Sequence, residues 1–101
     1  MRKSLTAVAF IFILALAAIA AAENVKLTFS GVLYPDGREG TIQASVKTAG
    51  NGSQVTVCSY FADPNNQYLG QYQANTAFSP VVADDVKQFC LDNFAARQNA
   101  N

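Results

Sequence analysis

Sixteen consecutive apolar residues, Ala7 to Ala22, stand near the start of this 101-residue chain and limit its folded part to the residues that follow. Two basic residues precede the run, and small alanine residues close it before Glu23. A basic start, an apolar stretch and a small-residue cleavage site are the parts of a secretory signal peptide. We therefore expect residues 1–22 to be a signal peptide and the protein to be secreted or periplasmic.

An uncleaved membrane anchor is the alternative, because Leu5 to Ala22 spans 18 residues and a membrane helix needs about 17 to 25. The Ala-rich end of this segment is weakly hydrophobic, however, and a small-residue cleavage site is typical of a signal peptide. We expect no stable membrane anchor once residues 1–22 have been removed.

The charges of residues 23–101 argue against nucleic acid as a partner. Five basic side chains stand against seven acidic ones, a formal charge of −2, and the basic residues are scattered along the chain. Such a surface offers little attraction to a phosphate backbone.

The chain also lacks His, which removes the usual general base and the commonest metal ligand. We expect no metal and no cofactor.

Cys58 and Cys90 are the only cysteines of the chain. In an exported protein an even number of cysteines predicts an intramolecular disulfide. Closing a loop of this length stabilises a small domain by about 3 to 4 kcal/mol in the chain-entropy model. A reactive thiol would instead call for a closely spaced pair or a neighbouring cation.

Alternation of apolar and polar residues predicts strands over residues 24–34, 41–48 and 54–62, with a weaker fourth strand over 67–75. Pro35-Asp36-Gly37 is a turn sequence between the first two strands. Asn51-Gly52 is the strongest short-range signal for a hairpin between the second and third.

The third strand leaves a choice open. Val55 and Val57 fall on one of its faces, and Cys58 falls on the other. If Cys58 joins a helix, that helix lies on the Cys58 side, unless a bulge near Ser59 shifts the alternation. Tyr60 either lies under the helix or extends an exposed aromatic patch, and the same alternatives apply to Tyr34.

A helix is predicted from Pro80 to Ala96, with Ser79 as its N-cap and acidic residues in its first turn. Its apolar stripe would face the sheet. Residues 97–101 are polar and are expected to form a frayed tail. The fold class is therefore α+β: a small antiparallel meander of three to four strands with one C-terminal α-helix packed on the sheet and one disulfide, in a single domain over residues 23–101.

The richest polar and aromatic stretch is residues 67–75. Tyr combines a flat apolar face with a hydroxyl, and Gln and Asn provide donors and acceptors, a combination that suits protein or carbohydrate partners. The candidate binding residues are Gln67, Tyr68, Gln71, Tyr72, Gln73 and Asn75. We expect Tyr68 and Tyr72 to share a face; the alternative is an ordinary strand packed at the margin of the core.

Asn51-Gly52-Ser53 matches the acceptor pattern for N-glycosylation. Asn51 is therefore a glycosylation site if the protein is eukaryotic, although a hairpin turn explains the same three residues.

These features favour an exported, disulfide-stapled binding or inhibitory protein, in which residues 67–75 and the Pro35 to Gly40 turn contact the ligand. A secreted effector or toxin that acts on another cell is the alternative. A small carboxylate-dependent hydrolase is a further one, but Asp84 and Asp85 are adjacent in a predicted helix and would point about 100° apart. We do not expect an enzyme. The sequence leaves the ligand and the oligomeric state open.

Overall fold

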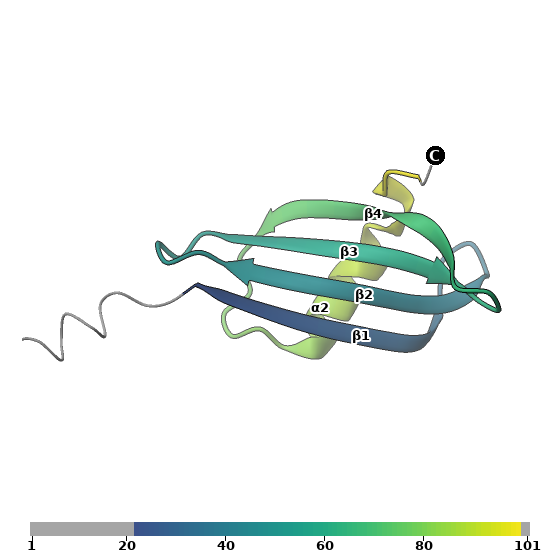
Figure 1. The fold of residues 1–101 in the computed structure, drawn as a ribbon, viewed down its shortest axis with the longest axis horizontal. Coiled ribbons are helices and arrows are strands. Elements are labelled where there is room, and N and C mark those ends of the chain that lie inside the picture. Colours follow the sequence, from purple (N-terminus) through teal and green to yellow (C-terminus); the bar gives the residue numbers. More distant parts are fainter. Residues whose placement is uncertain (1–21, 100–101) are drawn as a thin grey trace, which may run out of the picture.

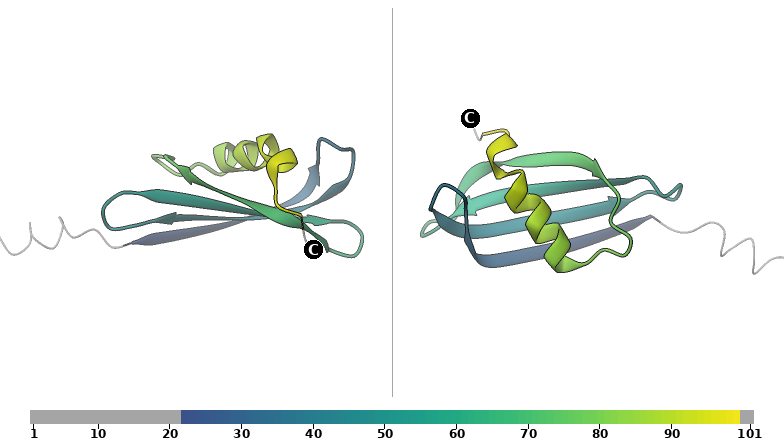
Figure 2. Two further views of the ribbon diagram at one scale, coloured as in Figure 1. Left: turned by 90° about the horizontal axis from the view of Figure 1, so that it is seen from above. Right: turned by 180° about the vertical axis from the view of Figure 1, so that it is seen from behind.

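The computed structural model describes residues 22–99, a four-stranded antiparallel sheet in the order β1-β2-β3-β4 with a helix across one face (Figures 1 and 2). The signal peptide predicted for residues 1–22 lies outside the described residues apart from Ala22. The elements are β1 (Glu23–Leu33), β2 (Glu39–Thr48), β3 (Gln54–Ala62), β4 (Gln67–Thr76), α2 (Ala83–Asp92) and a short 3₁₀ turn, η1 (Phe94–Ala96). The predicted meander with a C-terminal helix is confirmed.

The hairpin between β2 and β3 forms at the predicted turn. Gly52 adopts a φ of 92°, which the absence of a side chain permits. The Asn51 side-chain oxygen accepts hydrogen bonds from the Ser53 backbone N–H (3.0 Å) and hydroxyl (2.8 Å). The two strands then pair without a register shift from Thr48 opposite Gln54 to Gly40 opposite Ala62.

The alternation along β3 decides which face the helix covers. Thr56, Cys58 and Tyr60 are buried, whereas Val55 and Val57 are only half-buried. Because the pairing with β2 runs through Ser59 without interruption, no bulge is present there. The helix lies on the Cys58 side, and the opposite face of the sheet has no covering element among the described residues (Figure 2).

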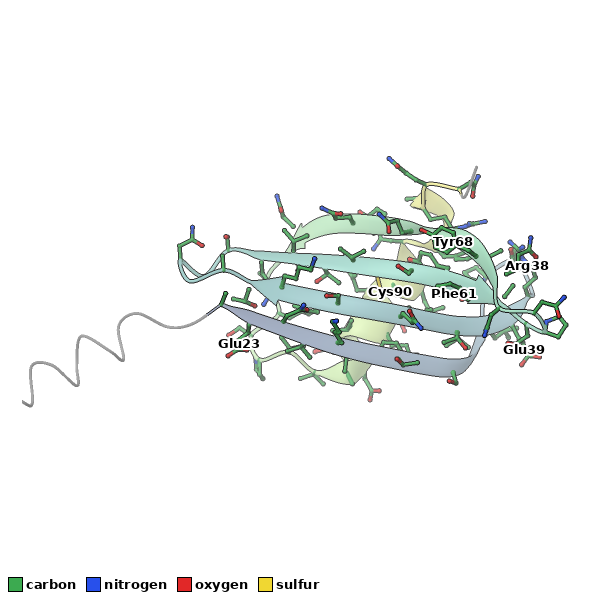
Figure 3. All side chains as sticks on the ribbon, in the orientation of Figure 1. Glu23, Arg38, Glu39, Phe61, Tyr68 and Cys90 are labelled. Atoms are coloured by element: carbon green, nitrogen blue, oxygen red, sulfur yellow. A yellow bond between two sulfur atoms is a disulfide. The ribbon has the colours of Figure 1, made fainter. Side chains whose placement is uncertain are left out.

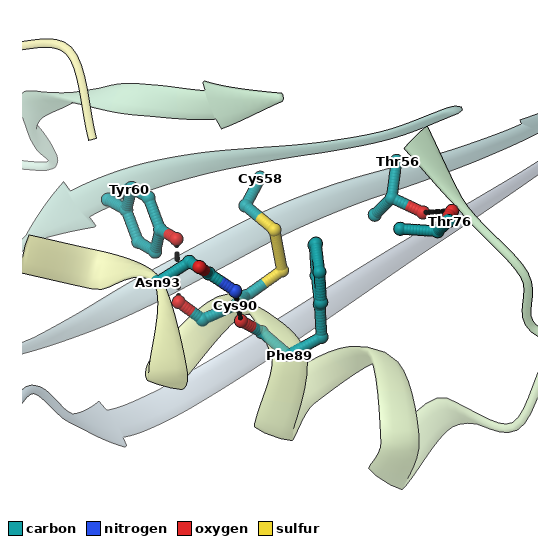
Figure 4. Close-up of a disulfide and its surroundings, with 7 residues drawn as sticks. All are labelled: Thr56, Cys58, Tyr60, Thr76, Phe89, Cys90 and Asn93. Carbon is teal, nitrogen blue, oxygen red and sulfur yellow. Dashed lines mark hydrogen bonds between the residues drawn. A yellow bond between two sulfur atoms is a disulfide. The ribbon is translucent and has the colours of Figure 1, made fainter. Parts of the chain in front are cut away.

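A disulfide joins the centre of the sheet to the helix, as predicted. Cys58 of β3 and Cys90 of α2 are fully buried, with their Cα atoms 5.7 Å apart (Figure 4). The Tyr60 hydroxyl donates a 2.6 Å hydrogen bond to the Cys90 carbonyl oxygen. The same turn of helix is therefore fixed to β3 by a covalent bond and by a buried hydrogen bond.

Three aromatic rings fill the space beneath the end of the helix. Tyr34 stacks on Phe94 with ring centroids 4.5 Å apart, and Tyr60 meets both rings edge-on. The Tyr34 hydroxyl lies 2.9 Å from the carbonyl oxygens of Thr41 and Phe61. Burial raises the pKa of the Tyr34 and Tyr60 phenols above the ordinary value for tyrosine. Both tyrosines thus lie under the helix and do not extend an exposed patch.

The helix begins later than predicted. Its N-cap is Val82, in an extended conformation, and Ser79 makes no capping hydrogen bond. The Gln54 side chain accepts a hydrogen bond from the Phe78 N–H (2.6 Å) and donates one to the Phe78 carbonyl (3.0 Å). This pairing holds the connection extended at the end of the sheet, so that the helix starts only at Ala83. It ends at Asp92, and η1 takes up the remaining turn.

The end of the chain also differs from the expected frayed tail. Gln98 exchanges two backbone hydrogen bonds with Gln71 of β4 (3.1 and 2.8 Å). The Arg97 guanidinium donates to the Leu69 carbonyl (2.9 Å) and lies 4.0 Å from the centroid of the Phe94 ring. Residues 97 and 98 therefore cover the outer edge of β4, while residues 100–101 lie outside the described part of the chain.

Candidate functional site

A bulge in β4 divides the predicted binding residues between the two faces of the sheet. Tyr60 is opposite Gly70, but Phe61 is opposite Tyr68, so that β4 contains one extra residue. An extra residue inverts the alternation of side chains beyond it. The expectation that Tyr68 and Tyr72 share a face is therefore wrong.

The two tyrosines have different surroundings. The Tyr68 side chain is 42% exposed, and its ring centroid lies 5.4 Å from that of Phe61. Tyr72 is half-buried on the helix side, with its ring centroid 5.8 Å from that of Phe89. Tyr68 is accessible to a ligand, whereas Tyr72 contributes to the packing between sheet and helix.

The amide side chains of the stretch mostly stay together. Gln71, Gln73 and Asn75 are exposed and lie opposite Ser59, Val57 and Val55 of β3, on the same face as Tyr68. Gln67 is exposed at the start of β4, opposite Ala62, whose side chain is on the buried face. The bulge therefore separates the six predicted binding residues into four on one face and two on the helix side.

We call the sheet face opposite α2 the open face; it is turned toward the viewer in Figure 3, where Phe61 and Tyr68 are labelled. The strand registers assign to it Asn24, Lys26, Thr28, Thr41, Gln43, Ser45, Lys47, Val55, Val57, Ser59, Phe61, Tyr68, Gln71, Gln73 and Asn75. The sequence predicted the polar outer positions of β2 but did not identify the contributions of β1, β2 and β3 as one surface with β4.

The open face is organised in rows. Three apolar side chains of β3, Val55, Val57 and Phe61, lie half-buried in one row, with Ser59 between the last two. The amide side chains of β4 form one border of this apolar row. Hydroxyl, amide and ammonium side chains of β1 and β2 form the other. Leu33, opposite Glu39 and 65% exposed, adds an apolar group at the Phe61 end of the sheet.

Two shallow depressions lie on this face. One has a volume of ≈ 530 Å³ and includes Lys47, Val55 and Gln73 in its lining; the other has ≈ 390 Å³ and includes Lys26 and Ser59. Both are lined by Val57. They therefore adjoin along the middle of the sheet and together form an open trough.

Charge is distributed unevenly about the sheet. Lys26 and Lys47 lie on the open face, where the carboxylate of Glu39 stands at the opposite end of β2 from Lys47. The helix on the other side carries Asp84, Asp85 and Asp92 against Lys87. The open face thus carries two ammonium groups and, at the far end of β2, one carboxylate, with Glu23 lining the same depression as Lys47. The helix carries three carboxylates and one ammonium group.

The predicted Pro35 to Gly40 turn is stiffened by its own side chains. The Arg38 guanidinium donates two hydrogen bonds to Asp36 (2.9 and 2.7 Å), and the Arg38 backbone N–H donates a third (3.0 Å). These bonds hold the pKa of the Asp36 carboxyl below its ordinary value. The turn lies at the end of the sheet where Phe61 and Tyr68 are found (Figure 3).

Other kinds of site find little support in the described residues. Between residues 22 and 99 no three His, Cys, Asp or Glu side chains lie close enough together to hold a metal ion. No helix in that range is long and apolar enough to cross a membrane. Asn51 is exposed at its turn, where a glycan would be accessible. Its glycosylation in a eukaryote stays a prediction.

Comparison of the chain with known protein families, with curated protein sequences and with solved structures finds no match. The function is therefore inferred from the geometry of the sheet and its side chains.

Proposed function

We propose that the protein is an exported binding protein whose recognition surface is the open face of the sheet. The observation that carries this proposal is the difference between the two faces. The helix covers one face only, and the other has an apolar row bordered by polar side chains. Export rests on the signal peptide predicted for residues 1–22.

The covered face provides the main stabilising contacts. It contains the disulfide and the ring cluster of Tyr34, Tyr60 and Phe94. Folding therefore does not require apolar side chains on the open face, yet Val57 and Phe61 stand there half-buried. Exposed apolar groups rimmed by polar ones are typical of an interaction site, and on this face Ser59 separates Val57 from Phe61.

Inhibition of a partner enzyme is a second candidate, favoured by the stiff turn at Pro35 to Gly40. A loop already held in one conformation by Asp36 and Arg38 loses little conformational freedom when it docks. An inhibitor of this type would lose potency on Asp36→Ala, which removes the bonds within the turn, and keep it on Val57→Lys. Binding through the open face predicts the reverse.

The test compares the same substitution on the two sides of the sheet. Val57→Lys places a charge in the apolar row, while Val82→Lys does so at the N-cap of the helix, where the side chain is 42% exposed. Binding of the purified exported protein to arrayed glycans and to extracellular proteins of the producing cells is measured for both variants and the wild type.

Loss of binding in Val57→Lys with retention in Val82→Lys supports the proposal. Equal loss in both variants, or full binding by Val57→Lys, would contradict it. Urea denaturation of each variant verifies that both are folded under the binding conditions.

A further inference from the structure

We infer that the ligand of the open face is a carboxylate-bearing polysaccharide that occupies the trough at Val57. This inference rests on the proposed binding function and goes beyond it by naming the chemical class of the ligand. Four observations carry it: the arrangement of rows, the shape of the trough, the unpaired lysines and the composition of the surface.

The rows match the two surfaces of a sugar ring. A pyranose has C–H groups on its faces and hydroxyl groups around its rim. Val55, Val57 and Phe61 offer an apolar floor, with Tyr68 at one end. The bordering side chains of β2 and β4 are mainly hydroxyls and amides, such as Gln73, that both donate and accept hydrogen bonds with sugar hydroxyls.

The shape of the trough favours a polymer. A pocket for a small molecule is usually enclosed and buries most of its ligand. Here the two depressions of ≈ 530 and ≈ 390 Å³ are shallow and adjoin at Val57. The larger one reaches across all four strands from Asn24 to Gln73, and the smaller one across β1, β2 and β3, so that together they offer room for more than one sugar unit.

The charges select an acidic polymer. Lys26 is opposite Ser45, two positions along β2 from Lys47, so the two ammonium-bearing residues are about 7 Å apart along the strand direction. Among residues 22–99 the only ion pair joins Arg38 to Asp36, and neither lysine is therefore neutralised there. The Glu39 carboxylate is eight positions from Lys47, about 26 Å along β2. Glu23 lines the same depression as Lys47 but forms no ion pair with it.

The composition of the surface disfavours a protein as the main ligand. The centres of protein interfaces are enriched in Trp, Tyr, Phe, Met and Arg and depleted in Lys and Ser. The open face has its two aromatic rings, Phe61 and Tyr68, at one end, and Lys26, Ser45 and Ser59 near its middle. Two lysines are also too few for nucleic acid, which is bound through many phosphate contacts.

The experiment uses three polymers that separate sugar from charge. Polygalacturonate carries both pyranose rings and carboxylates, its fully methyl-esterified form carries the rings alone, and poly-glutamate carries carboxylates alone. Binding of the purified exported protein to each is measured by titration calorimetry at low and at moderate salt. We expect binding to polygalacturonate at least tenfold tighter than to either of the others, and weaker at the higher salt concentration.

Variants locate the interaction. Lys26→Gln and Lys47→Gln should each weaken binding to polygalacturonate about threefold, and the double variant about tenfold. Lys87→Gln is the matched control, because it removes the same charge from the helix on the other side of the sheet. It should leave the affinity unchanged.

The outcomes distinguish this inference from the proposed function. Equal binding of the methyl ester, or equal binding of poly-glutamate, overturns the acidic-polysaccharide inference. If no polymer binds but Val57→Lys abolishes binding of an arrayed ligand or extracellular protein, the inference fails and the open face remains the binding surface. If polygalacturonate binds equally to the wild type and to Val57→Asn, which removes the apolar side chain without adding a charge that attracts the polymer, both proposals are overturned.

Discussion

The two faces of this one sheet differ in how firmly their side chains are held. On the covered face, Cys58 is bonded to the helix, Tyr60 is hydrogen-bonded to it, and both are fully buried. On the open face, neighbouring residues of the same strand, such as Val57 and Ser59, are half-buried and contact no second layer among the described elements. Adjacent residues of β3 thus lie in two different environments.

This difference teaches that stability and recognition can be separated in a very small domain. A domain of this size has little buried surface to spare. Concentrating the disulfide and the aromatic cluster on one face leaves the composition of the other face free of packing constraints. Substitutions on the covered face should therefore change the free energy of unfolding, and those on the open face should change affinity.

Removal of the disulfide should have the largest effect. The bond closes a loop with a sequence separation of 32, and Cys58→Ala with Cys90→Ala should lower the free energy of unfolding by about 3 to 4 kcal/mol. Urea denaturation followed by circular dichroism measures this change. A loss below about 1 kcal/mol would contradict the central role that we assign to this bond.

Alkaline pH should be the next strongest perturbation of the covered face. The raised pKa values of Tyr34 and Tyr60 mean that the unfolded chain loses these protons at lower pH than the folded chain. Their contribution is therefore complete below about pH 10 and decreases above it, by up to about 1.4 kcal/mol per pH unit for each phenol.

Tyr60→Phe tests this pH dependence. At neutral pH the variant should be less stable by about 1 kcal/mol, because the hydrogen bond to the Cys90 carbonyl is lost. Its unfolding free energy should then fall less steeply than that of the wild type between pH 10 and 11.5. Parallel pH profiles for the two proteins would show that the buried Tyr60 hydroxyl is not responsible.

Gly70→Ala should have an effect smaller than removal of the disulfide and specific to the β4 edge. Gly70 has a φ of +111°, and an added Cβ would lie 1.9 Å from the Gln98 carbonyl oxygen. Gly37 has a similar φ of +94° but nothing within 4 Å of its Cβ position. We expect a loss of about 2 kcal/mol for Gly70→Ala and about 1 kcal/mol for Gly37→Ala.

Amide hydrogen exchange separates the two causes of that loss. Only Gly70→Ala should expose the Gln98 N–H, which in the wild type donates to the Gln71 carbonyl. Equal exchange at Gln98 in both glycine variants would mean that the contact with the tail is unimportant.

Substitutions on the open face should have the smallest effect on stability. Gln73→Ala and Lys47→Gln change side chains at the border of the apolar row, and each should alter the free energy of unfolding by less than about 0.5 kcal/mol. The same urea denaturation measurements apply. A larger loss in either variant would mean that the open face contributes to the fold and that the two roles are not separate.

The features that the sequence predicted well depend on local patterns. β3 spans Gln54 to Ala62, as its alternation indicates. The hairpin before it follows from the positive φ that Gly52 accepts. The pairing of Cys58 with Cys90 required only that the chain contains two cysteines and that its strand and helix pack together.

The features that it missed depend on contacts between distant residues. The late start of the helix follows from Gln54, which binds the backbone of Phe78 across 24 positions. The tail is held by its contact with β4 at Gln71. The bulge that places Tyr68 and Tyr72 on opposite faces adds one residue to β4. No feature of the sequence other than Gly70 marks its position.

The contact between Gln98 and Gln71 also affects how sheets of this kind could associate. It obstructs one margin of the sheet, whereas β1 at the other margin pairs only with β2 among the described strands. Two copies joined through β1 would turn their obstructed β4 margins outward, and further strand addition would meet Gln98 on either side. Edge-to-edge growth beyond a pair would therefore require Gln98 to leave Gln71.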